Sequence, residues 1–529
     1  MALAKGLGQD SQATMLARHI AANEWRDAHG IALDLLRADA GDDRAVAALA
    51  TIAEAHGNIG KAAELLTRAL ARRPDDARYL IRQAKLFLLL SRTEDARLAA
   101  LLAARQTMPD MESADDLGVV LARVEEHEEA ARIFRIATQG DGARAATWRN
   151  LGNVLQFLGE LAEANGAYEQ ALVLDPDDSR SWFALIHLRR QGEADEPRLT
   201  ALLTLWEARG QDADDALRIG HSIAKLHEDR GRHDAMMTWL HRAKSTKKTL
   251  VRHDPDATDA LYALAARAPR PAPSTRAPES QASPIFVTGL PRSGTTLVDR
   301  IIGAHPDMVG VGESPAFSLI VKRLGGSGTD RVLDAATLQA AGRIDSDRLA
   351  SLYLETLSAR TGGKRTVDKM PLNILYAGLI HSAFPDARII CLRRHPLDVI
   401  LANYRQMFSA EFGYYDHSYD LAHIARWYVA FDRLVAHWSA TLPAGRFLQI
   451  DYEALVDDQM GSTRRLLDAC GLGWDDACLN FHKNGAAVST ASSVQVREPI
   501  HNRSVGAWRR HADALAPAMA ELDRAGIAW

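Results

Sequence analysis

A glycine-rich loop near the middle of the chain has the spacing of a phosphate-binding loop. In the stretch FVTGLPRSGTTLVDR, Gly289, Gly294 and Thr296 occupy the glycine and Ser/Thr positions of the pattern G-x-x-x-x-G-K-[ST]. The lysine that would reach the terminal phosphates of a nucleotide is replaced by Thr295, and the cation of the loop is Arg292. The loop therefore predicts an anion-binding site, and the missing lysine raises the question of which anion it holds if the ligand is not a nucleoside triphosphate.

Two further cations follow apolar runs in the same half of the chain. Lys369 lies in RTVDKMPLN and Arg394 lies in CLRRHPLD, each near the end of an expected strand. Ligands of parallel sheets bind outside the carboxyl ends of the strands. Three cations and a helix N-terminus suit a ligand with several anionic groups, held without a dedicated metal cage. We therefore expect Arg292, Lys369 and Arg394 to face one polyanionic ligand, and we expect no metal ion.

Alternating strands and helices must position these cations. The apolar run Pro284–Gly289 predicts a strand, and the periodicity of Thr295–Gly303 predicts a helix that begins at the loop. A second strand is expected from Asp386 and a third from Arg446, each followed by a helix. This alternation indicates an α/β domain with a mostly parallel sheet and a P-loop-like anion site.

The first half of the chain repeats every 34 residues. The segment WRNLGNVLQFLGELAEANGAYEQALVLDP, which begins at Trp148, has the spacing of a tetratricopeptide repeat. Small residues recur in this register because the two antiparallel helices of each repeat approach closely. The pattern predicts an all-α solenoid. The three series of small residues are Gly152, Gly118, Ala84 and Ala50; Ala164, Ala130, Ala96 and Ala62; and Ala171, Ala137, Ala103 and Ala69.

This change of pattern divides the chain. We expect a tetratricopeptide-repeat solenoid over residues 1–248, a connecting segment over 249–283 and the α/β domain over 284–529. The stretch APRPAPSTRAPESQASP lacks hydrophobic periodicity and favours an extended, poorly packed linker. The concave surface of a solenoid suits a docked protein or peptide, while a stabilising role or a homodimer stays open.

Composition argues against several other classes of partner. A formal net charge of -5 over 529 residues gives no reason to expect a nucleic acid or an anionic membrane surface. The chain has no run of roughly 18 consecutive apolar residues, so no membrane insertion is expected. The N-terminus lacks a signal-peptide core, and Cys391, Cys470 and Cys478 form no disulfide or metal pattern. We therefore expect a cytoplasmic protein.

Both anion motifs resemble those of a known family. The stretch GLPRSGTTLVDRIIGAHPDMVGVGES resembles the start of the sulfotransferase fold, closest to the tyrosylprotein sulfotransferases and the bacterial sulfotransferases that carry tetratricopeptide repeats. IICLRRHPLDVILANY resembles the second cofactor motif of that family, and the similarity covers most of residues 284–508. The resemblance implies transfer of a sulfuryl group from 3'-phosphoadenosine 5'-phosphosulfate (PAPS) to a hydroxyl acceptor. A protein or peptide tyrosine is one candidate acceptor.

The resemblance also implies roles for single residues. Arg394 would bind the 3'-phosphate of PAPS, and Lys369 and Arg292 would stabilise the leaving and transferring groups. Glu313, in VGES, matches the general base that takes the proton of the acceptor, with a helix-capping role for Glu313 or His305 as base as the alternatives. The donor-binding residues implied are Arg292, Ser293, Gly294, Thr295 and Thr296 in the loop, Arg394, Tyr452, and Ser492, Arg497 and Ser504 near the C-terminus.

Two observations keep other functions open. The family's serine eight residues after the 3'-phosphate arginine is Ala402 here, so a hydroxyl contact worth roughly 1 to 2 kcal/mol is missing unless Asn403 or Arg405 replaces it. The chain could then be a repeat scaffold with a catalytically weak domain. The loop spacing also admits a P-loop kinase or NTPase-like enzyme, although the loop lysine is missing and no carboxylate is evidently placed for magnesium.

Overall fold

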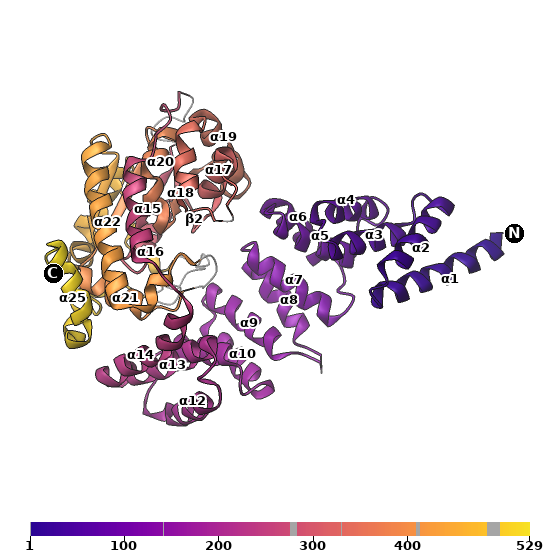
Figure 1. Cartoon of the computed structure of the whole chain (residues 1–529), viewed down its shortest axis with the longest axis horizontal. Coiled ribbons are helices and arrows are strands. Elements are labelled where there is room, and N and C mark those ends of the chain that lie inside the picture. The colour runs from indigo at the N-terminus through magenta and orange to yellow at the C-terminus, as the bar shows by residue number, and fades with distance from the viewer. Residues whose placement is uncertain (1, 141, 276–282, 330, 409–412, 484–497) are drawn as a thin grey trace. The chain divides into compact units, whose positions relative to one another are not determined.

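Packing divides the chain into two compact units, residues 1–181 and 182–529. The computed structural model describes residues 2–140, 142–275, 283–329, 331–408, 413–483 and 498–529 (Figure 1). The division does not coincide with the predicted limits at 248 and 283, because four helices that precede the sheet belong to the second unit. The predicted limits mark the change in sequence pattern.

The first unit consists of helices in consecutive pairs, as the repeat pattern predicts (Figure 1). A pair of helices forms each repeat, so that α9 and α10 hold the segment that begins at Trp148. The all-α fold of this region is confirmed. The helices are α1 (Ala2–Ala21), α2 (Trp25–Ala38), α3 (Asp43–Ala55), α4 (Ile59–Leu70), α5 (Ala77–Leu89), α6 (Thr93–Ala104), α7 (Met111–Arg123), α8 (His127–Ala137), α9 (Ala145–Leu158) and α10 (Leu161–Leu174), and α11 (Ser179–Leu188) crosses into the second unit.

The small residues of the repeat lie where paired helices come closest. A Cβ atom on Gly118 would lie 2.6 Å from the Phe134 ring, and one on Gly152 would lie 2.5 Å from the Tyr168 ring. Both glycines and both aromatic residues are 34 positions apart, so the same contact is repeated in successive repeats. The close approach that the sequence predicts is therefore confirmed at these positions.

The second unit contains a five-stranded parallel sheet with the order β2-β3-β1-β4-β5. The predicted parallel α/β domain is confirmed. The strands are β1 (Ile285–Gly289), β2 (Met308–Gly312), β3 (Arg365–Lys369), β4 (Arg388–Arg393) and β5 (Phe447–Asp451). Before the sheet come α12 (Glu196–Arg209), α13 (Ala213–Asp229), α14 (His233–Leu250) and α15 (Pro255–Arg267). The others are α16 (Thr295–Gly303), α17 (Ala316–Gly325), α18 (Ala335–Ala340), α19 (Ser346–Thr361), α20 (Ala377–Ala383), α21 (Pro396–Tyr404), α22 (Leu421–Thr441), α23 (Tyr452–Asp457), α24 (Gln459–Cys470) and α25 (Ala516–Ala525).

The central strand β1 is buried on both faces of the sheet. Ile285 and Val287 pack with residues of α16 and α24, whereas Phe286 packs in a second cluster with residues of α19, α20 and α22. Both faces are covered because a strand of a parallel sheet carries apolar side chains on each side. Among the described residues, no helix is long and apolar enough to cross a bilayer.

The connecting segment is more ordered than its composition suggests. Helix α15 lies within it and packs on α22, where Trp427 Nε1 donates a hydrogen bond of 2.7 Å to Tyr262 Oη. Further on, Ser274 N donates to Ser382 O at 2.7 Å. Residues 268–275 form no helix or strand and are exposed or partly buried, and Ser274 and Thr275 bond to the α/β domain. Residues 276–282 lie outside the described residues.

We expect Gly152→Ala to destabilise the repeat unit by about 1–3 kcal/mol, because the added methyl group overlaps the buried Tyr168 ring. Gly166→Ala is the matched control, since Gly166 lies on the exposed side of α10 with no atom near the added Cβ. Alanine should stabilise the helix there by about 0.5–1 kcal/mol. Thermal denaturation of the full chain, followed by far-ultraviolet circular dichroism, measures both. Equal effects of the two substitutions would contradict the repeat contact.

Candidate active site

The anion loop leaves the central strand and turns back into α16 by two glycines with left-handed backbone. Gly289 has φ 144° and Gly294 has φ 108°. A Cβ atom on Gly294 would lie 2.6 Å from the Tyr452 ring, so no side chain fits there. Ser293 Oγ donates to Leu290 O at 2.7 Å, which closes the turn. The loop thus ends at the N-terminus of α16, where the backbone N–H groups and the helix dipole favour an anion.

Arg394 binds the loop to the C-terminal segment. Its Nη1 donates to Arg292 O at 3.0 Å, and its Nη2 donates to Ser504 O at 2.7 Å. The guanidinium lies 4.5 Å from the centre of the Tyr452 ring, and Tyr452 Oη is 3.0 Å from Ser504 Oγ. Residues that follow β1, β4 and β5 therefore meet at one place. The structure brings together Arg292, Arg394, Tyr452 and Ser504, as the sequence predicts.

Two other arginine side chains lie close enough to Arg292 to affect its charge. Burial, helped by the nearby Arg405 and Arg394 guanidinium groups, lowers the pKa of Arg292 to about 10. A cation whose charge is opposed in this way gains from an anionic ligand. The loop from Gly289 to Thr296 carries no carboxylate to supply that charge.

A buried lysine and a half-exposed glutamate form an ion pair at the ends of β3 and β2. Lys369, the last residue of β3, is fully buried, and its Nζ donates to Glu313 Oε1. The Glu313 side chain is 44% exposed. Glu313 does not cap α17, which begins three residues later and has Pro315 at its N-cap. One end of the pair is therefore open to solvent and the other is enclosed.

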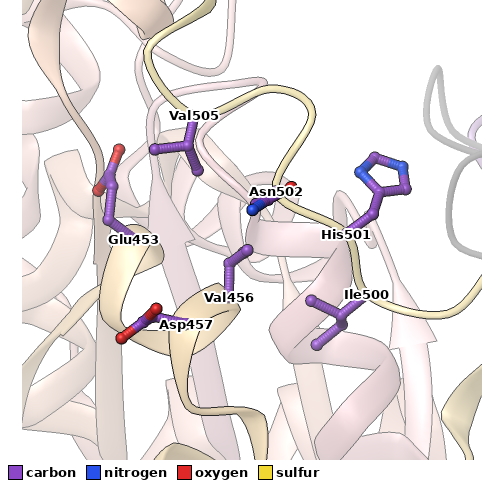
Figure 2. A pocket seen from close by; sticks show the side chains of 7 residues that line it. All are labelled: Glu453, Val456, Asp457, Ile500, His501, Asn502 and Val505. Carbon is purple, nitrogen blue, oxygen red and sulfur yellow. The ribbon is translucent and has the colours of Figure 1, made fainter.

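A pocket of about 490 Å³ is lined by Glu453 and Val505, which are the sequence neighbours of Tyr452 and Ser504 (Figure 2). It lies between α23, which begins with Tyr452, and the C-terminal segment that carries Ser504. Its walls are partly acidic, since Glu453 and Asp457 face it from α23. The other lining residues are Val456, Ile500, His501, Asn502 and Val505.

Two parts of the chain are similar to known protein families. Residues 284–476 match the model of the sulfotransferase family, and residues 145–178 match that of the tetratricopeptide repeat. The chain carries a sulfotransferase-family domain. The matched residues include the anion loop, Glu313, Lys369 and Arg394. Ser504 lies beyond them.

Relatives share both the domain and, in one case, much of the chain. An uncharacterized protein of Aquifex aeolicus is 30% identical over 417 residues, which is 74% of this chain and 52% of that protein. A protein-tyrosine sulfotransferase of Drosophila melanogaster is 24% identical over 250 residues, 42% of this chain and 46% of that protein. The chain therefore spans about half the length of these relatives. The sulfotransferase domain of the Synechococcus PCC 7002 olefin synthase has 21% identity and a TM-score of 0.34, and the match covers 47% of this chain and 97% of that domain.

The other site residues predicted in this domain are Thr295, Thr296, His305, Ser492 and Arg497. Thr295 and Thr296 are buried in the first turn of α16. His305 forms a turn, in which its Nδ1 accepts from Asp307 N at 3.2 Å, and so it is not brought to the Lys369 pair. Two predicted residues, Ser492 and Arg497, lie outside the described residues.

Two carboxyl groups near Lys369 were not predicted from the sequence. Burial raises the pKa of Asp299 to about 6, and its Oδ1 has no hydrogen-bond partner. Burial raises the pKa of Asp368 to about 7, even though Tyr353 Oη donates to its Oδ2 at 2.7 Å. Lys369 opposes both shifts by its charge. The charge of Lys369 therefore acts on three carboxyl groups, those of Glu313, Asp299 and Asp368.

The position of one of these aspartates, Asp299, could have been predicted from the sequence. Asp299 stands one helical turn after Thr295 and Thr296, so the period of α16 places it on the side of the helix below the loop. Asp368 had no such signal, because its surroundings depend on Tyr353 from α19, which only the folded chain brings near.

We expect Asp368→Asn to remove a pH-dependent destabilisation of the sulfotransferase domain. A carboxyl whose folded pKa is raised to about 7 stabilises the fold below its unfolded pKa and loses that stability as the pH rises to about 7. The stability difference between wild type and variant should therefore shift in favour of the variant by about 1–3 kcal/mol from pH 4 to pH 8. Urea denaturation at both pH values measures it. The exposed Asp513→Asn is the control, and a difference independent of pH would contradict the burial of an ionisable Asp368.

Proposed function

We propose that the chain is a cytoplasmic sulfotransferase that transfers a sulfuryl group from PAPS to a hydroxyl acceptor. The observation that carries this proposal is the placement of two chemical groups at one edge of the sheet. One is the arginine-rich anion loop, and the other is the Lys369–Glu313 pair. Membership of the domain in the sulfotransferase family supports it.

The donor would lie along the loop. Its phosphosulfate would accept hydrogen bonds from the backbone and hydroxyl groups of residues 293–296 and from Arg292, and Arg394 would bind the 3'-phosphate. The pocket between α23 and the C-terminal segment offers space beside these groups for the rest of the nucleotide. The residues present therefore fit a ligand with separate anionic ends.

The reaction would be a direct, in-line displacement. A bond forms between the acceptor oxygen and sulfur while the bond between sulfur and the bridging oxygen of the nucleotide breaks. Glu313 would take the hydroxyl proton, and Lys369 would stabilise the charge that gathers on the leaving oxygen. The half-exposed carboxylate and the enclosed ammonium suit these two tasks, because the acceptor arrives from solvent and the leaving group is held in the protein. A sulfuryl group carries less negative charge than a phosphoryl group, so the proposal includes no metal ion.

A protein or peptide tyrosine is the acceptor we favour. Two features support it: the tetratricopeptide repeat at residues 145–178, whose concave face could dock a polypeptide, and relatives named protein-tyrosine sulfotransferases. Incubation of the purified chain with radiolabelled PAPS and a lysate, followed by mass spectrometry of the labelled species, identifies the acceptor. Label found only in glycans or small metabolites would contradict a polypeptide acceptor.

We expect nucleotide binding to depend on a 3'-phosphate. Because Arg394 can donate two charge-assisted hydrogen bonds, adenosine 3',5'-bisphosphate should bind about 10- to 100-fold more tightly than ADP in calorimetric titrations. Arg394→Gln should remove most of this difference. If the wild type were indifferent to the 3'-phosphate, the PAPS proposal would fail and a P-loop kinase or NTPase-like enzyme would be favoured.

We expect Glu313→Gln to lower kcat by about 10²- to 10⁴-fold, because the amide cannot accept the acceptor's proton. Affinity for adenosine 3',5'-bisphosphate should be unchanged, since the glutamate acts on the acceptor side. Glu355→Gln, on the exposed face of α19, is the matched control and should retain full activity. Sulfate incorporation that survives Glu313→Gln would defeat the proposed mechanism. A wild type without any transfer would favour a scaffold.

A further inference from the structure

The backbone of Arg292 has a conformation that is unusual for its place in the fold. Among the described residues other than glycine, four have a φ in the left-handed region. Asn23, Ser91 and Glu125 each follow a helix of the first unit, where this conformation commonly ends a helix. Arg292, with φ 64°, lies instead between a strand and the next helix. A residue with a side chain adopts this conformation at a cost in free energy, so neighbouring groups must hold it.

Both peptide groups that flank the Cα atom of Arg292 are bonded to the region of α21. Arg394, two residues before the helix begins, donates to Arg292 O at 3.0 Å. Asn403, in the last turn of the helix, donates from Nδ2 to Pro291 O at 2.9 Å. The carbonyl before Arg292 is therefore held from one end of α21, and the carbonyl after it is held from the other end.

Packing alone does not explain an amide at position 403. The Asn403 side chain is fully buried, and its Nδ2 also donates to Val399 O at 2.9 Å. Its Oδ1 is buried and has no hydrogen-bond partner within the described protein. Such an oxygen destabilises a fold, and a leucine would fill a similar volume without it. The bond to the Pro291 carbonyl is a better reason for the amide than its volume.

The C-terminal end of α21 is itself anchored by α14. His241 Nδ1 and Tyr404 Oη are 2.7 Å apart, and Tyr404 directly follows Asn403. One turn further along α14, Lys244 Nζ donates to Gln406 O at 3.4 Å. Helix α14 precedes the residues that match the sulfotransferase family. The bonds that hold the anion loop therefore continue into a helix outside the matched residues.

We propose that Asn403 is a positioning residue of the donor site. By holding the Pro291 carbonyl, it keeps Arg292 in the left-handed backbone that directs its side chain to the 5' end of the donor. Asn403 itself makes no contact with the donor in this role. The inference rests on the proposed sulfotransferase function, because it takes the ligand of the loop to be the phosphosulfate of PAPS.

A purely structural role of Asn403 makes a different prediction. If the amide only stabilised α21, its loss should weaken binding at both ends of the nucleotide alike, since Arg394 lies just before the same helix. If Asn403 acts through Arg292, the loss should fall on ligands that carry a 5'-phosphate. A ligand with only a 3'-phosphate, which the donor proposal assigns to Arg394, should then be affected little.

The test is calorimetric titration of the full chain with adenosine 3',5'-bisphosphate and with adenosine 3'-monophosphate. We expect Asn403→Leu to weaken binding of the bisphosphate about tenfold and to change that of the monophosphate by less than about twofold. The double variant Asn403→Leu/Arg292→Gln should bind the bisphosphate like Arg292→Gln alone, because Asn403 acts through Arg292. Tyr404→Phe removes the bond to His241 and should have a smaller effect in the same direction as Asn403→Leu.

Val399→Ala is the matched control. Val399 is 1% exposed on the same helix, so its truncation disturbs the packing of α21 without removing a bond to the loop. It should leave the ratio of the two affinities unchanged. Circular dichroism of each variant precedes titration, and Asn403→Ala is measured in place of Asn403→Leu if the latter does not fold.

Unchanged bisphosphate affinity in Asn403→Leu, equal losses for the two nucleotides, or effects that add in the double variant would overturn the inference. If the wild type does not bind the bisphosphate, the donor proposal fails, and the same variants are titrated with inorganic pyrophosphate. Weaker pyrophosphate binding by Asn403→Leu would then support its role toward the loop. Equal binding, or no binding by the wild type, would overturn that role as well.

Discussion

The common direction of five strands is the constraint on which the candidate site depends. Each strand ends at the same edge of the sheet and is followed there by part of the site. A shift of one residue in any strand would turn its side chains to the opposite face. On β3 such a shift would exchange Lys369 for Asp368, a buried cation for a buried acid. The parts delivered by β1 to β5 in turn are the anion loop, Glu313, Lys369, Arg394 and Tyr452.

Burial of Lys369 then determines what its neighbours must be. An ammonium group removed from water needs partners of opposite charge, and here Glu313 supplies the direct one. Asp299 and Asp368 lie close enough to feel the same charge, yet burial raises the pKa of each. The charge of the cluster therefore depends on whether these two aspartates are protonated. Perturbed carboxyl groups of this kind are consistent with the acid–base site proposed above.

The parts of the candidate site that depend on consecutive residues could be predicted from the sequence. Contacts between residues that are far apart in the sequence could not. Gly289, Gly294 and Arg292 are readable because the loop's geometry depends on consecutive residues, and α16 begins and ends as its periodicity predicts. Strand β2 was not predicted, since MVGVG lacks the long apolar runs of β1 and β4, whereas a strand that ends near Lys369 was expected. The ion pair of Glu228 with Arg405 could not be predicted, because the two residues are 177 positions apart and only folding brings them together.

The contact between Glu228 and Arg405 shows why the boundary between the two packed units differs from the change of sequence pattern at the linker. Helices α13 and α14 continue the helical half of the sequence, yet Met236, Met237 and Leu240 belong to the same hydrophobic cluster as the sheet domain. Lys244 of α14 is buried, donates to Ser418 O at 2.9 Å and has a pKa lowered to about 7 by desolvation. Burial of this amine costs free energy, and the hydrogen bond to the Ser418 backbone offsets part of that cost. The helices before the linker are therefore part of the structure that supports the site, and a catalytic unit that began at the linker would lack them.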